Sequence, residues 1–462
     1  MVIPCSTDRR TQEPVASGLS REFTRFIDST PREQTVNYER QQNESVAKVA
    51  VGKSSFVYII KKPISLVMAI QIYLDNNATT AVDPQVLEEM LPYFTTHYGN
   101  ASSTNHVFGK KASAAVVRAR ERVADLLEAK EEEIVFTSGA TESINMAIKG
   151  VFERYQSIGN HIISCVSEHK SVLDVLRALE KKGAKVTYLS VDKDGNIDLN
   201  ELEEAITDET VLISLMFANN ETGVIHPVKE IAEIARDKNI LFFCDATQAI
   251  GKIPVSVKEI GVDMMALSGH KIYGPKGVGA LYVRKKSRKI QLEPLVHGGG
   301  QEKGMRGGTY NVPGIVGLGA ACERCKELLK KDGKRIAKLR SYLESALLNI
   351  DETFVNSGDA KRLPNVSNIV IRFIKAEQLM ANLKNVAMSS GSACATGSLD
   401  PSHVLMAMGL DKEDAHSSLR FSLGRFNTEA EIDLLIDMLN QKVTKLRGES
   451  PVWELFKKGV IT

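Results

Sequence analysis

Between residue 134 and about residue 283, apolar and polar positions alternate between two periodicities, that of strands and that of helices. Short apolar runs rich in β-branched and aromatic residues predict strands, and the stretches between them have the apolar spacing of helices. The expected strands are Ile134–Phe136, His161–Cys165, Lys185–Leu189, Val211–Met216, Ile240–Cys244, Met264–Leu267 and Gly279–Val283. The helices between them include Thr141–Glu153 and Lys229–Lys238. This alternation predicts an α/β domain with a largely parallel sheet.

The pattern changes after about residue 330. A long amphipathic helix is predicted over Ile336–Asn349, followed by short strands and a terminal helix over Glu429–Lys445. Such a mixture is typical of a smaller α+β domain. We therefore expect a large α/β domain over residues 86–330 and a small domain made of residues 71–85 and 331–452.

The first seventy residues have a different pattern. Residues 1–46 contain few apolar clusters and no clear periodicity, which predicts disorder. They carry seven acidic residues beside six arginines, whereas transit peptides are poor in acidic residues. The apolar stretch 56–72 is broken by Lys61-Lys62-Pro63 and is too short to span a membrane. We expect residues 1–70 to be a disordered or dispensable extension, with the working protein beginning near Met68.

Composition restricts the classes of partner. A chain of 462 residues with 43% hydrophobic and 25% charged residues is typical of a globular protein with more than one domain. Its net charge of +2 gives no electrostatic bias toward nucleic acid or an acidic membrane, so neither is an expected partner. Six scattered cysteines indicate a reducing compartment, and the prediction is cytoplasmic. Cys322 and Cys325 form a CxxC without a second pair, so no metal site is expected.

A lysine and an aspartate occupy the ends of two expected strands. Asp245 ends the run Ile240–Asp245, and Lys271 follows the next strand, 26 residues later. A lysine that forms a Schiff base with pyridoxal phosphate (PLP) works with an acidic group that keeps the pyridine nitrogen protonated. Parallel strands would bring both residues to one edge of the sheet. A lysine next to a histidine is by itself an ordinary surface pair, so this interpretation depends on the surrounding motifs.

Several other segments could complete such a site. Phe136–Ser143 runs from a strand through a glycine turn into a helix, whose N-terminus suits a phosphate; simple capping of the helix is the alternative. His169 could stack on a cofactor ring and assist proton transfer, or be an ordinary polar residue. The amides of Asn219–Gly223 could hold a carboxylate or a phenolic oxygen, or form a turn. The glycine-rich segments 297–302 and 306–311 could contact an anion.

A second chemical signal lies near the C-terminus. Cys394 is surrounded by small residues in Ser389–Ser398, which predicts a mobile, exposed loop and a candidate nucleophile if its pKa is lowered. A buried structural cysteine is the usual alternative. Beyond it, Leu419–Phe426 supplies two arginines, of which one could clamp a substrate carboxylate and the other is expected to be structural.

Taken in order, these motifs resemble the NifS/IscS-type cysteine desulfurases of the class V aminotransferase family, over about residues 70–450. The matching segments are Tyr73–Thr80, Ser138–Ser143, Ser167–Lys170, Asn219–Gly223, Asp245–Gln248, Ser268–Lys271, Arg306–Thr309 and Ser392–Cys394. The resemblance implies the type I fold of PLP enzymes, a large α/β domain with a mainly parallel sheet plus a smaller α+β domain. It also implies a homodimer that takes sulfur from L-cysteine and leaves L-alanine.

The resemblance also implies roles for individual residues. Lys271 would form the Schiff base and act in catalysis, Asp245 would pair with the pyridine nitrogen, and Gln248 would reach the phenolic oxygen. His169 would stack on the ring and act in catalysis. Phosphate ligands would be Ala140, Thr141, Ser268 and His270, with Thr309 reaching the phosphate of the other subunit.

For the substrate, the resemblance implies that Asn220 and Arg420 bind the carboxylate and that Cys394 takes the sulfur as a persulfide. The long loop running to Ser402–Val404 resembles the branch that passes sulfur to an iron–sulfur scaffold protein; tRNA thiolation is a further possible destination. A selenocysteine lyase or an aminotransferase of the same fold is the alternative, because a fold alone does not fix the reaction.

Overall fold

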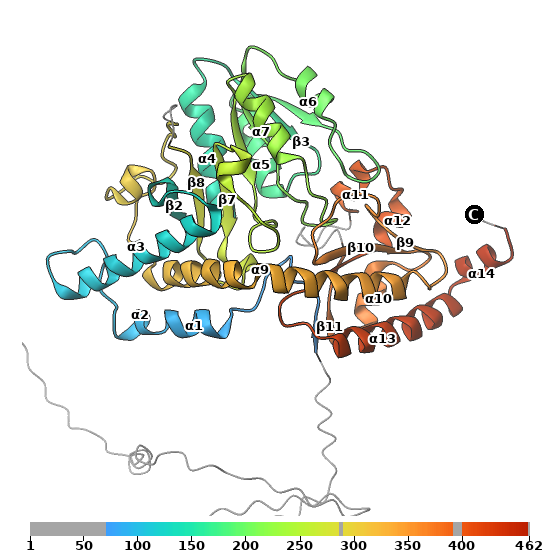
Figure 1. The fold of residues 1–462 in the computed structure, drawn as a ribbon. Coiled ribbons are helices and arrows are strands. Elements are labelled where there is room, and N and C mark those ends of the chain that lie inside the picture. Colours follow the sequence, from blue (N-terminus) through green and yellow to red (C-terminus); the bar gives the residue numbers. More distant parts are fainter. Residues whose placement is uncertain (1–70, 286–289, 391–399, 461–462) are drawn as a thin grey trace, which may run out of the picture. The chain divides into compact units, whose positions relative to one another are not determined.

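A seven-stranded sheet dominates the computed structural model, which describes residues 71–285, 290–390 and 400–460 (Figure 1). All pairs are parallel except those of β8, which runs antiparallel to both of its neighbours. The order across the sheet is β2 (Ile134–Thr137), β8 (Gly279–Val283), β7 (Met264–Ser268), β6 (Leu241–Asp245), β5 (Thr210–Ser214), β3 (His161–Cys165) and β4 (Lys185–Leu189). The predicted α/β class with a largely parallel sheet is confirmed.

Helices cover both faces of this sheet because its strands are apolar on both faces. In β6, Leu241 and Phe243 belong to one hydrophobic cluster, and Phe242 and Cys244 to another on the opposite face. Burying one such side chain contributes about 1.5–3 kcal/mol. The first face packs on α4 (Ala140–Tyr155) and α5 (Lys170–Glu180), and the second on α3 (Val107–Leu127), α7 (Val228–Asp237), α8 (Val257–Ile260) and the first half of α9 (Val312–Leu347).

Helix α9 is longer than the sequence pattern predicts. Instead of a helix beginning at Ile336, one continuous helix of 36 residues runs from Val312 to Leu347. Its first half contributes buried residues to the cluster of the large sheet, and its second half, from Ile336, contributes to a separate cluster. The helix therefore passes through the expected domain boundary near residue 330, and the domain limits stay a prediction.

The separate cluster covers a four-stranded antiparallel sheet. Its strand order is β12 (Ser389–Ser390), β13 (Ser418–Ser422), β10 (Val366–Ile371) and β9 (Thr353–Val355). Nearby, β1 (Ile72–Tyr73) pairs in parallel with β11 (Val386–Ala387). The predicted terminal helix is α13 (Glu429–Gly448), which begins with a capping box formed by Thr428 and Glu431.

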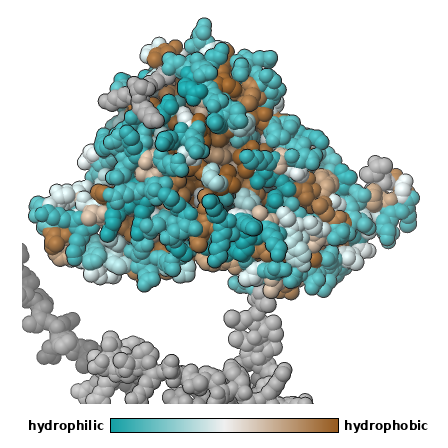
Figure 2. All heavy atoms as spheres, in the orientation of Figure 1, coloured by the Kyte–Doolittle hydropathy of each residue, from teal (hydrophilic) through white to brown (hydrophobic). Residues whose placement is uncertain are grey.

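The remaining helices are short. They are α1 (Pro84–Met90), α2 (Pro92–Thr95), α6 (Leu199–Glu204), α10 (Ala376–Asn382), α11 (His403–Ala407), α12 (Lys412–His416), α14 (Pro451–Lys457), η1 (Glu131–Glu133), η2 (Gly269–Lys271) and η3 (Gln301–Gly304). Hydrophilic residues cover most of the face seen in Figure 2. None of the helices in the described ranges is long and apolar enough to cross a membrane. The expectations for residues 1–70 lie outside the described residues.

Candidate active site

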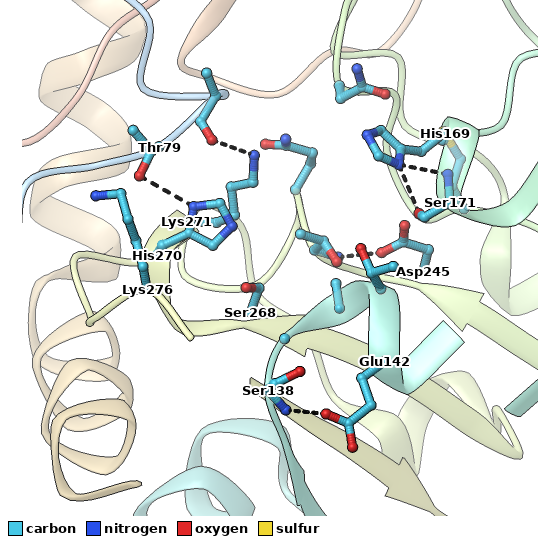
Figure 3. A pocket seen from close by; sticks show the side chains of 18 of the residues that line it. Thr79, Ser138, Glu142, His169, Ser171, Asp245, Ser268, His270, Lys271 and Lys276 are labelled. Atoms are coloured by element: carbon cyan, nitrogen blue, oxygen red, sulfur yellow. Dashed lines mark hydrogen bonds between the residues drawn. The ribbon is translucent and has the colours of Figure 1, made fainter. Parts of the chain in front are cut away.

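A cavity of about 570 Å³ opens where strands β3, β6 and β7 end and helix α4 begins (Figure 3). This is the sheet edge at which the sequence predicts a site. The residues predicted from sequence that line it are Ala140, Thr141, His169, Asn220, Asp245, Gln248, Ser268, His270 and Lys271. Segments more than 130 residues apart along the chain therefore converge on one space.

Lys271 reaches the cavity from η2, the turn that directly follows β7. Its Nζ donates hydrogen bonds to the backbone carbonyl of Asn77 and, at 2.7 Å, to that of Ala78. Both acceptors come from the loop after β1, so the amine is held by neutral groups of a distant segment. An amine that is oriented by carbonyl oxygens inside a cavity is suited to act as a nucleophile once it has lost a proton.

Asp245 ends β6 and keeps 7% of its surface exposed, at the cavity wall. Its Oδ1 accepts the backbone N–H of Thr247 at 3.0 Å. A second carboxyl, Glu168, is 1% exposed, and its Oε1 accepts the backbone N–H of Met216. Burial, and after it the charge of Asp245, raises the pKa of Glu168 well above its usual value. Both effects disfavour a negative charge on Glu168 beside Asp245.

The two histidines at the cavity are both held neutral. Burial, opposed by Asp245 and aided by Lys271, lowers the pKa of His169. Burial, with the charge of Lys271 next, lowers the pKa of His270 to about 4. Nδ1 of His169 accepts the backbone N–H of Ser171 at 3.1 Å, so the proton of its neutral ring is on Nε2. Figure 3 places His169 across the cavity from Lys271 and His270.

The start of helix α4 forms the floor of the cavity. Gly139 precedes it with φ 153°, a conformation that side chains rarely allow, and this turn exposes the first N–H groups of the helix. Glu142 also lines the cavity, and Arg306 binds its carboxylate at 2.8 Å. Burial raises the pKa of Glu142, but hydrogen bonds from Arg306 and Ser138 outweigh it and lower that pKa. With this carboxylate paired, the helix end can accept an anion.

The two arginines of β13 and the following loop have different surroundings. Arg420 is 3% exposed and lies behind the cavity wall, where it binds Asp75 at 2.7 Å and the carbonyl of Asn220 at 3.1 Å. Arg425 binds two carboxylates, those of Asp83 at 2.7 Å and Asp332 at 2.8 Å. A guanidinium saturated in this way is structural, so Arg420 stays the preferred carboxylate ligand, although it does not itself line the cavity.

The two remaining predicted site residues are Thr309 and Cys394. Thr309 is exposed and lies outside the lining of the cavity. Cys394 lies outside the described residues. Both described flanks of its segment adjoin the site: Ser389 pairs with Arg420 in the β12–β13 register, and Ser402 Oγ donates to Glu221 at 2.6 Å.

Three residues at the site have no role predicted from the sequence: Asn77, Lys252 and Glu168. Asn77 accepts hydrogen bonds from Lys271, Gln248 and Lys252, but it lies more than 170 residues before them. Asn77 belongs to the matched segment Tyr73–Thr80, so its motif could be identified from the sequence, but its hydrogen bonds to Lys271, Gln248 and Lys252 could not. Glu168 belongs to the motif Ser167–Lys170, in which the sequence predicts a role for His169 alone.

Comparisons with known proteins agree with this arrangement. Residues 72–435 match the family model for aminotransferase class-V. The chain belongs to the class-V aminotransferase family. It is 51% identical over 394 residues to a protein named cysteine desulfurase IscS from Anaeromyxobacter dehalogenans (strain 2CP-C), covering 85% of this chain and 97% of that protein. IscS of Pasteurella multocida (strain Pm70) is 50% identical over 395 residues, which cover 85% of this chain and 98% of that protein.

Among solved structures, a NifS-like protein is similar with a TM-score of 0.76 and 41% identity, covering 81% of this chain and all of that one. The structure of SspA in complex with cysteine gives a TM-score of 0.69 and 40% identity over 77% of this chain and all of that one.

The family uses pyridoxal phosphate, and the cavity residues suit that cofactor. The Lys271 amine offers a nucleophile for the aldehyde, the Asp245 carboxylate an acid partner for the ring nitrogen, and the start of α4 an anion site for the phosphate. Because three different strand ends supply these complementary groups to one space, the cavity fits the cofactor as a whole.

Proposed function

We propose that this protein is a PLP-dependent cysteine desulfurase, which releases sulfur from L-cysteine and leaves L-alanine. The observation that carries the proposal is the convergence of Lys271, Asp245 and the start of α4 on one cavity. Two relatives at 50–51% identity that are named cysteine desulfurase IscS support the same reaction. When bound, the cofactor supplies an electron sink that stabilises negative charge at the substrate carbon.

The residues of the chain divide the remaining work. The free amine of Lys271 takes the proton from the α-carbon and later returns it. Asp245 would be the acidic partner of the cofactor's ring nitrogen, and the raised pKa of Glu168 disfavours a second negative charge beside it. His169 lines the cavity, where it would pack on the cofactor ring, and its Nε2 could carry a proton there.

Sulfur transfer is assigned to Cys394. Its thiolate attacks the substrate sulfur, an S–S bond forms as the C–S bond breaks, and the electron pair stays with the carbon fragment. Protonation of that fragment leaves L-alanine, and Cys394 carries the persulfide. A protein acceptor such as an iron–sulfur scaffold would then take the sulfur, for cluster assembly or for tRNA thiolation.

Incubating the purified protein with PLP, L-cysteine and a reductant tests the function. Sulfide and alanine in equal amounts are the expected products. An aminotransferase would instead give a keto acid and a transferred amine, and a selenocysteine lyase would act on selenocysteine in strong preference to cysteine. Either result, or no turnover at all, would overturn the proposal.

The protein is proposed to act as a homodimer in the cytoplasm. Thr309 is exposed and does not line the cavity of its own chain, which suits a contact with the phosphate of a second copy. Exposed apolar side chains occur along α1, α2, the start of α3 and the segments between them, as a subunit interface requires: Leu87, Leu91, Phe94, Tyr98 and Phe108. Sedimentation that finds a fully active monomer would contradict the dimer. The four described cysteines are unpaired, which supports a reducing compartment.

Replacing Arg420 with lysine should raise KM for L-cysteine about tenfold to 100-fold, because lysine keeps the positive charge but cannot form the bidentate pair of hydrogen bonds that a guanidinium makes with a carboxylate. That change corresponds to roughly 1.4–2.8 kcal/mol of binding free energy. Arg425→Lys is the matched variant: it should lower the melting temperature, because Arg425 binds Asp83 and Asp332, and leave KM within about twofold. Steady-state kinetics would contradict the assignment if KM rose only in Arg425→Lys.

A further inference from the structure

A lysine that the reaction does not use lies beside the cavity. Lys252 is four residues beyond Gln248, and its Nζ donates to Oε1 of Gln248 and, at 3.0 Å, to Oδ1 of Asn77. Within the described ranges it forms no ion pair with a carboxylate. A partly buried amine without a counter-charge is costly, so its position calls for a functional explanation.

Asn77 connects this lysine to the reactive one. Its backbone carbonyl accepts from Lys271 Nζ and, at 3.0 Å, from Gln248 Nε2. Its Oδ1 accepts from Lys252 Nζ and, at 2.9 Å, from Asn365 Nδ2. One asparagine thus ties Lys252, Gln248 and Lys271 into a single hydrogen-bonded group.

The surroundings of Lys252 favour its neutral amine. Burial, and then the positive charges of Lys271 and Arg420, lower the pKa of Lys252 well below its usual value, while Cys325 opposes them weakly. His270, another titratable group near Lys252, is itself neutral, because burial and then the charges of nearby lysines lower its pKa to about 4. A neutral amine has two N–H groups, and those of Lys252 donate to Oε1 of Gln248 and Oδ1 of Asn77.

The acceptor on Gln248 fixes the direction of its amide. Because Oε1 faces the Lys252 amine, Nε2 must point the other way, where it already meets the Asn77 carbonyl. Gln248 lines the cavity, so the orientation decides whether the site presents a donor or an acceptor. Lys252 and the Asn77 carbonyl favour the same orientation, and without Lys252 only the carbonyl would hold it.

We propose that Lys252 is a positioning residue, which holds the amide oxygen of Gln248 away from the cavity so that Nε2 is the atom offered to the bound group. The proposal rests on the proposed function, since the acceptor of that N–H would be the phenolic oxygen of PLP. A donor there stabilises the negative oxygen and so lowers the pH at which the bound chromophore loses its proton.

The test is a pH titration of the visible absorbance of bound PLP in the full-length protein. Lys252→Met, which keeps the length of the side chain but not the donors, should raise the midpoint by about one pH unit. Gln248→Met should raise it by a similar amount. The double variant should show no further rise, because Lys252 acts through Gln248. Lys258→Met, an exposed lysine of α8, should leave the midpoint unchanged.

The other outcomes are decisive as well. Additive shifts in the double variant would mean that Lys252 acts through its charge alone. An unchanged midpoint in Lys252→Met would mean that Lys252 has no role. Either result overturns this proposal, but the proposed function stands as long as the protein binds PLP. If Lys252→Met fails to fold, Lys252→Gln keeps one donor and should give a smaller shift that again vanishes in the Gln248→Met background. A wild-type protein that binds no PLP would overturn the proposed function and this proposal together.

Discussion

Replacing Lys271 with alanine is expected to lower sulfide release from L-cysteine by at least about 10⁴-fold. The amine serves twice in the proposed reaction: it bonds to the cofactor, and it moves the proton of the substrate α-carbon. The same variant should lose the visible absorbance of the bound cofactor. It should still retain PLP in part, because the start of helix α4 and Asp245 remain in the cavity.

Lys276 makes this prediction specific, because it is a second lysine lining the cavity. If Lys276 were the reactive amine, Lys276→Ala would abolish turnover and absorbance, whereas Lys271→Ala would keep both. Sulfide release and absorbance spectra of the two variants therefore distinguish the two lysines. Normal turnover in Lys271→Ala would contradict the assignment. The exposed Lys258 supplies a control whose replacement should change neither measurement.

The sheet and much of the cavity could be predicted from the sequence because both depend on local pattern. Every second residue of β6 faces the same cluster, and the expected strands His161–Cys165, Lys185–Leu189 and Gly279–Val283 coincide with β3, β4 and β8. Parallel strands then carry the residues that follow them to one edge. Asp245 and Lys271 could be placed together for that reason alone.

The continuity of α9 could not be predicted in the same way. Gly333 lies in a polar stretch between the two halves of the helix, and a glycine inside a helix costs about 1 kcal/mol relative to alanine. Local pattern therefore favours a break before Ile336. Burial of the first half against the large sheet and of the second half in the other cluster outweighs that cost.

The contacts of Asn77 were beyond prediction for a different reason. Its hydrogen bonds join segments that are 143–345 residues apart, and no spacing within a motif encodes them. In the sequence, Lys252 looks like an ordinary surface lysine. What distinguishes it is the position of its amine, which donates to Gln248 and Asn77 beside the cavity. The pairing of Glu168 with Asp245 likewise exists only after two strands have been placed in the sheet.

Replacing Cys394 with serine should separate cysteine binding from sulfur transfer. A hydroxyl is a poor nucleophile toward sulfur, so sulfide release should fall by at least about 100-fold, or roughly 2.7 kcal/mol in the barrier. The cavity is unchanged, so L-cysteine should still bind and alter the absorbance of the cofactor. Ser389 pairs with Arg420, the proposed ligand of the substrate carboxylate. Cys394 follows Ser390 by four residues, and a chain of four residues can span at most about 14 Å, so the sequence keeps Cys394 within that reach of Ser390.

The buried cysteines are controls built into the chain. Burial raises the pKa of Cys165 to about 11 and, against the opposing effect of Arg425, that of Cys325 also to about 11. Burial also raises the pKa of Cys244 and of Cys322 well above the usual value. These thiols hold their protons at neutral pH, so Cys322→Ala should release sulfide at the wild-type rate. Brief exposure to L-cysteine, alkylation and peptide mass mapping should then find the extra sulfur on Cys394. Sulfur on any of the four buried cysteines, or an unchanged rate in Cys394→Ser, would show that the transferring thiol is a different one.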